Sequence, residues 1–173
     1  MSEAPGKVRL RLRGEPDEGP ELPILADGPA LVRTVAVVGA HGAVALGPLL
    51  AGLRAALPGA AEVRAILTRA GAASATEGGA LVLRAGPSEM AAQLAALDPG
   101  ALRIGVGAAF VALARPGLTI LLTAGASRAE WEPRIRQLRP RFDLVLDQHR
   151  DRLAADLATR FLATTGVTPT PSR

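Results

Sequence analysis

Short apolar runs and amphipathic stretches alternate along this chain. Continuous apolar runs bounded by turn residues are typical of strands covered on both faces, and they lie at residues 35–38, 63–67, 80–83, 102–106, 118–122 and 142–146. Apolar residues at helical spacing predict helices between and after them, at residues 46–57, 88–97, 131–138 and 153–162. This order predicts an α/β fold, a three-layer Rossmann-like sandwich around a mostly parallel sheet of about six strands.

Residues that favour helix starts precede several of these helices. Ser88 and Asp147 can cap the helices that follow them, because their side chains can accept from free backbone N–H groups. Ser127 and Glu130 have the spacing of a capping box. We therefore expect helices to begin close to these positions.

The N-terminal residues have a different pattern. Apolar residues and arginines alternate over residues 8–13, which predicts a half-buried strand with a cationic outer face. Turn residues follow at 14–20, and residues 21–25 can form the returning strand of an N-terminal β-hairpin. We expect this hairpin or extension to occupy residues 1–30, one α/β domain to occupy 31–165, and a flexible tail to occupy 166–173.

Composition excludes several kinds of chemistry. The chain of 173 residues contains no cysteine and no tyrosine, and its one lysine is Lys7. Disulfides, thiol nucleophiles, cysteine metal sites and a Tyr-Lys proton relay are therefore absent. The formal net charge of +4 is carried mainly by arginine, and with only 2% aromatic residues we expect no nucleic-acid binding.

Residues 34–53 contain no Asp, Glu, Lys or Arg, a length that could span a membrane. Glycines, Pro48 and His41 interrupt this stretch, so a buried strand, a glycine turn and a helix explain it better. The first residues do not have the pattern of a secretory signal. We expect no membrane association and a cytoplasmic location.

The glycine turn after the first predicted strand is the main candidate site, because such turns expose backbone amides at a helix start. It comprises Gly39, Ala40, His41, Gly42, Ala43, Val44 and Ala45. One interpretation is a phosphate-binding turn, and the other is a tight connection that serves only packing.

Two kinds of nucleotide site fit this turn. The spacing of Gly39, Gly42 and Ala45 is compatible with a dinucleotide site, and Arg69 after the second strand could accept the 2′-phosphate of NADP. A P-loop would instead need a lysine and a hydroxyl where Ala45 and Leu46 stand. The strand at 102–106 also ends without a carboxylate for magnesium, so we expect no nucleotide hydrolysis.

The order of segments nevertheless resembles a family of small P-loop proteins, that of molybdopterin-guanine dinucleotide biosynthesis protein B and its relatives. The similarity rests on residues 35–57, 75–83 and 118–152. It implies a nucleotide-binding fold and an accessory role in the assembly of a metal cofactor or metalloenzyme. It also implies that Asp147 stands where such proteins read the base.

Other polar residues give weaker indications. His41 and His149 are too far apart in sequence to indicate a metal site. An arginine-rich stretch at 134–141 could bind a protein partner or form a solvated helix face; it contains Arg134, Arg136, Arg139 and Arg141. Three functions remain open: non-hydrolysing nucleotide or phosphate binding, a small NADP-dependent oxidoreductase, and a ligand-free interaction module. A role without catalysis is favoured over an enzymatic one.

Overall fold

The computed structural model describes residues 22–41, 46–68 and 74–147, and the predicted α/β fold is confirmed there. Its strands are β1 (Ala30–Gly39), β2 (Ala61–Leu67), β3 (Ala75–Glu77), β4 (Ala80–Ala85), β5 (Arg103–Val106), β6 (Arg115–Leu122) and β7 (Leu144–Leu146). Its helices are α1 (Gly47–Ala56), α2 (Pro87–Ala95), α3 (Ala108–Leu113) and α4 (Pro133–Leu138), with short 3-10 turns η1 (Arg128–Glu130) and η2 (Arg139–Arg141).

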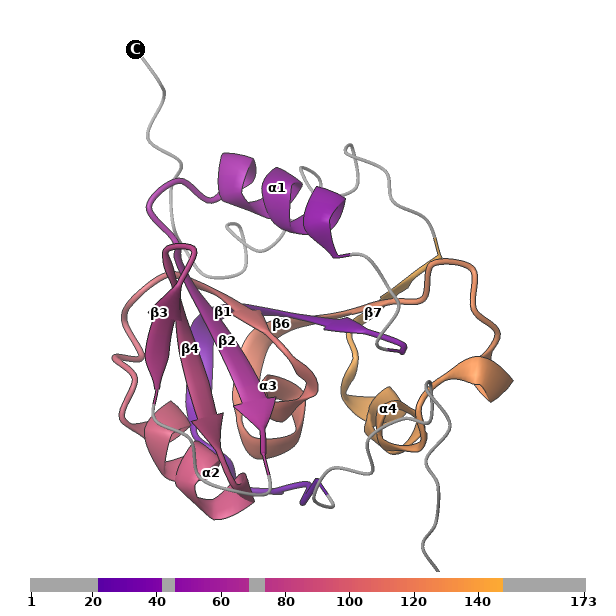
Figure 1. Cartoon of the computed structure of the whole chain (residues 1–173). Helices are drawn as coiled ribbons and strands as arrows, with labels where there is room; N and C mark the ends of the chain where they lie inside the picture. The colour runs from indigo at the N-terminus through magenta and orange to yellow at the C-terminus, as the bar shows by residue number, and fades with distance from the viewer. Residues whose placement is uncertain (1–21, 42–45, 69–73, 148–173) are drawn as a thin grey trace, which may run out of the picture.

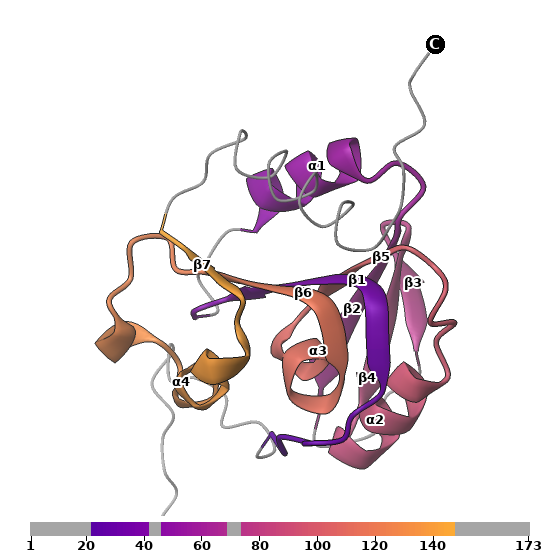
Figure 2. The same ribbon diagram turned by 180° about the vertical axis from the view of Figure 1, so that it is seen from behind.

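The strands form one sheet in the order β3-β4-β2-β5-β1-β6-β7. Every neighbouring pair is parallel except β3 and β4, which form a hairpin. Helix α1 covers one face of the sheet, and α2, α3 and α4 cover the other (Figure 1 and Figure 2). These layers form the three-layer sandwich expected from the sequence.

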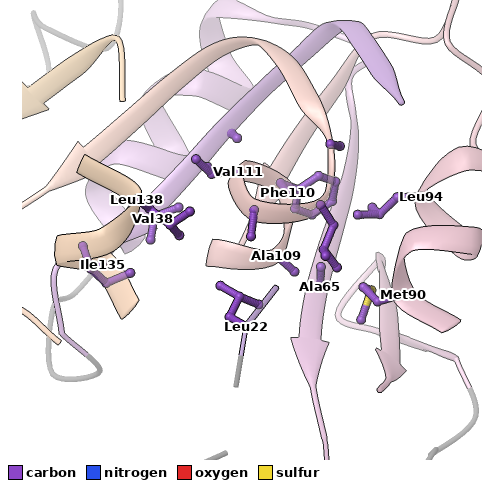
Figure 3. Close-up of a cluster of buried hydrophobic side chains, with 14 of the residues drawn as sticks. Leu22, Val38, Ala65, Met90, Leu94, Ala109, Phe110, Val111, Ile135 and Leu138 are labelled. Atoms are coloured by element: carbon purple, nitrogen blue, oxygen red, sulfur yellow. The ribbon is translucent and has the colours of Figure 1, made fainter. Parts of the chain in front are cut away.

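Each face of the sheet has its own core. Val35 and Val37 of β1 pack with the leucines of α1, whereas Ala36 and Val38 contribute to the core on the opposite face. That second core, shown in Figure 3, gathers Phe110 of α3 with residues of α2 and α4. Because β1 is apolar toward both faces, it lies in the interior of the sheet.

Helix α3 is a helix that the hydrophobic pattern does not reveal. Its sequence, AAFVAL, is entirely apolar, and all of its residues except Ala108 are buried. The helix packs closely against β5: a Cβ added at Gly105 would lie only 2.9 Å from Phe110 Cδ1, so glycine is needed there. A helix buried all round carries no amphipathic period, so it resembles a short buried run in the sequence.

Several details differ from the sequence-based expectations. The predicted returning strand at 21–25 is wrong over residues 22–25, which form no strand; Leu25 N–H instead donates to Ala112 O. β3 is a seventh strand that residues 75–77, with the sequence ATE, did not indicate. Helix α2 begins at Pro87 with Gly86 as its N-cap, so Ser88 is not its cap. The predicted strand at 8–13, the last helix and the tail lie outside the described residues.

Within the described part of the chain, no helix is long and apolar enough to cross a membrane.

Candidate functional site

The carboxyl ends of β1, β6 and β7 meet at one edge of the sheet. Gly39 pairs with Leu122, and Leu122 pairs with Leu146. The residues that follow these strand ends therefore lie close to one another, and they include His41, Thr123 and Asp147. Open α/β sheets bind ligands at this edge.

The direction of the connections changes at β1. The chain leaves β1 toward α1 on one face, whereas it leaves β5 toward α3 and β6 toward α4 on the other face (Figure 1). Two neighbouring strands whose connections diverge leave a crevice outside their carboxyl ends. The predicted glycine turn begins at the carboxyl end of β1, where the connections diverge.

Ala40 is fixed by the protein itself. It is fully buried, its N–H donates to Leu122 O at 2.9 Å, and its carbonyl accepts from Glu132 N–H at 3.0 Å. Its amide is therefore engaged within the fold, while the half-buried His41 follows at the edge. The remaining residues of the predicted turn, Gly42, Ala43, Val44 and Ala45, lie outside the described residues, as do Arg69 and His149.

Thr123 orients Asp147. Its hydroxyl, on a side chain only 1% exposed, donates to Asp147 Oδ1 at 2.8 Å. Its backbone N–H donates to Leu146 O at 2.9 Å, which continues the pairing of β6 with β7. Asp147 itself is exposed, so the carboxylate has a defined orientation and still faces solvent. Thr123 is not recognisable from the sequence as a site residue, because a threonine that ends an apolar strand gives no distinct signal.

A tight turn follows Thr123. Ala124 and Gly125 have positive φ angles of 49° and 82°, and Ala126 N–H donates to Thr123 O at 3.0 Å. These features are those of a type I′ turn. Ala124 is the one non-glycine residue with positive φ among the described residues, a conformation that costs roughly 1–2 kcal/mol. The Trp131 indole N–H donates to Ala126 O at 3.2 Å and holds the turn in place.

The predicted capping box is confirmed beside this turn. Ser127 donates to Glu130 Oε2 from both its N–H and its hydroxyl, each at 2.7 Å. These two hydrogen bonds lower the pKa of Glu130 below its ordinary value, and the charge of His41 lowers that pKa further.

The arginine-rich stretch divides into two groups. Arg141 lies inward and donates to the carbonyls of Val111, Ala112 and Leu25 at 3.1, 3.2 and 2.7 Å. Arg136 and Arg139 are exposed on the surface. Arg141 therefore has a structural role, whereas Arg136 and Arg139 face solvent and Arg134 is half-buried.

A metal site is not formed by the described residues: no three His, Asp or Glu side chains within 22–41, 46–68 and 74–147 lie close enough to hold an ion. Comparisons of the chain with protein-family models, with curated proteins and with solved structures found no match.

Proposed function

We propose that this protein binds a phosphate-bearing ligand, most simply a nucleotide, at the carboxyl edge of the sheet beside β1, and that it does not hydrolyse the ligand. The observation that carries the proposal is the change of direction at β1, where the connection to α1 diverges from those that follow β5 and β6. In open α/β sheets a crevice of this kind is the usual ligand site.

The side chains and amides at this edge would favour a ligand that places an anionic group near α1 and a hydrogen-bond donor near β7. The first turn of α1 contains no acidic residue, and its N-cap Leu46 provides no side-chain hydrogen bond. Pro48 has no N–H, so within that turn the amides of Gly47 and Leu49 carry the partial positive charge of the helix start. Asp147, oriented by Thr123, offers a carboxylate that could accept from a base or a ribose hydroxyl.

Hydrolysis is not part of the proposal because two groups that it requires are missing from the sequence. No lysine follows Lys7, and Ala45 and Leu46 stand where a P-loop carries its lysine and hydroxyl. β5 is followed by Gly107 rather than by a carboxylate that could hold magnesium. Together with the resemblance of the segment order, this favours an accessory, non-catalytic role, which we extend to the assembly of a metal cofactor or metalloenzyme.

A thermal-shift panel of GTP, ATP, NADP and inorganic phosphate tests the proposal. A ligand at a hundred times its Kd should stabilise the protein by about 2.7 kcal/mol, or roughly 5–10 °C in Tm. Gly42→Val should abolish the shift, because a branched side chain would stand where the phosphate approaches the backbone. A shift with NADP alone would instead favour the oxidoreductase and the predicted role of Arg69. No shift with any of the four compounds would contradict the proposal.

Thr123→Val separates the two halves of the site. It keeps the shape of the side chain and removes the hydroxyl that orients Asp147. We expect weaker binding of nucleotides and unchanged binding of inorganic phosphate. Thr76→Val, an exposed position on the distant strand β3, serves as the matched control and should change neither.

A further inference from the structure

An open groove of about 420 Å³ lies on the side of the sheet that α2 and α4 cover. Its lining residues are Leu22, Pro23, Ile24, Pro87 and Gln137. Ile24 is 41% exposed, a large apolar side chain left in contact with solvent. The groove is thus mainly apolar, with the polar Gln137 of α4 along it.

The described chain begins in this groove and is fixed there. Leu22 is 5% exposed and belongs to the core beneath α3, as Figure 3 shows. Leu25 N–H donates to Ala112 O at 2.9 Å, and Arg141 donates to Leu25 O at 2.7 Å. Because residues 22–25 are held at the groove, the residues directly before Leu22 must start from it.

Those preceding residues are strongly acidic. Residues 14–21, which we call the acidic segment, contain Glu15, Asp17, Glu18 and Glu21 and no basic residue.

The opposite charge lies on α4 and the turn after it. Residues 133–141 contain four arginines and no acidic residue. Arg136 and Arg139 are exposed, and Gln137 between them lines the groove. The four carboxylates are therefore joined through Leu22 to a groove whose neighbouring helix α4 contains arginines and no acidic residue, and opposite charges attract.

We propose that the acidic segment, residues 14–21, docks along this groove and over the arginines of α4. The segment is tethered at Leu22, so its local concentration at the groove is on the order of millimolar or higher. An acidic peptide from another protein would have to compete with that concentration. The arginine surface is thus covered by the chain's own N-terminal residues, and a protein partner of α4 binds only after it displaces them.

Disulfide trapping in the full chain tests this placement, because the protein has no cysteine of its own. Gly14→Cys marks the far end of the acidic segment and Gln137→Cys marks the groove. Ala55→Cys, an exposed position on α1 across the sheet, replaces Gln137→Cys in the control pair. Under mild oxidation we expect the 14–137 pair to close within one chain at least tenfold faster than the 14–55 pair.

Tethering alone would bring residue 14 near the groove at times, so charge variants decide the matter. In the 14–137 background, Arg136→Glu with Arg139→Glu should slow closure roughly fivefold, as should 1 M NaCl, which screens charges beyond about 3 Å. Adding Glu15→Lys and Asp17→Lys to the Arg136→Glu, Arg139→Glu background should restore the rate. Closure that is insensitive to salt and to these charges would overturn the proposal. Disulfides formed between two chains would overturn it in favour of a second copy as the occupant.

Discussion

Gly107 holds the turn from β5 into α3 in a conformation that other residues rarely adopt. Its φ is +119°, and a Cβ there would lie 2.4 Å from Ala65 O. Gly107→Ala would therefore add both backbone strain and a clash with the backbone of β2, and we expect a loss of about 2–4 kcal/mol in the free energy of unfolding. Urea unfolding measures the loss.

Gly59→Ala is the matched control for that change. Gly59 also has a positive φ, +80°, but no atom lies within 4 Å of its added Cβ. Only the conformational cost of about 1–2 kcal/mol remains there. Equal losses at the two positions would show that the close approach of Gly107 to Ala65 contributes nothing.

Glu130 is a single residue that makes the stability of the folded protein depend on pH. Its pKa is lowered in the folded protein, first by the two Ser127 hydrogen bonds and then by His41. A lowered folded pKa means that the stabilisation is present above the unfolded pKa of about 4.3 and is lost as pH falls through the folded value. Ser127→Ala removes the hydroxyl donor and should raise the pKa of Glu130, as an NMR titration of its carboxyl carbon would report. An unchanged pKa would contradict the assigned cause.

At the scale of elements, α3 depends on groups outside its own six residues. Arg141 donates to the carbonyls of Val111 and Ala112 near the end of that helix and to Leu25 O. The last carbonyls of a helix have no partner within the helix, and a cation there also opposes the negative end of its dipole. One side chain thus joins α3, η2 and the segment that enters the groove.

Removing that side chain should loosen all three elements. Arg141→Met keeps a long apolar stem and loses the guanidinium, so we expect a cost of about 1.5–3 kcal/mol, the range for hydrogen bonds to charged groups. Hydrogen exchange at the Leu25 amide should also quicken. Arg139→Met, at an exposed position two residues earlier, should stay within about 0.5 kcal/mol of wild type. Similar costs for the two variants would assign Arg141 to the surface instead.

The burial pattern of each element explains whether the sequence could predict it. The long strands of the sheet and helix α1 are patterned by burial, so period and turn residues indicate them. α3 lacks a polar face, and β3 is a three-residue edge strand with no apolar run, so neither has a local signal. The inward role of Arg141 is equally invisible, because a charge run looks the same whether its members face water or buried carbonyls.

For the whole molecule, the predicted α/β fold with its mostly parallel sheet indicated the edge of the sheet on which to expect a site, but not the contacts within that edge. The sequence indicated Asp147 and the glycine turn, and the fold brings Gly39 and Asp147 to one edge of the sheet. The hydrogen bond from Thr123 to Asp147 joins residues that are distant in sequence. Such contacts depend on strand order and register, which hydrophobic patterning alone does not specify.

Nucleotide turnover tests the molecule as a whole. With magnesium, the purified protein should release phosphate from GTP or ATP no faster than a buffer blank, because the chain has neither the P-loop lysine nor a carboxylate after β5. Ala45→Lys restores the cation alone and should tighten nucleotide binding several-fold, since a lysine there would meet the phosphates. It should not restore turnover, because the metal still lacks its carboxylate. Phosphate release that persists through repeated purification of the unaltered protein would show that this edge of the sheet carries out a reaction as well as binding.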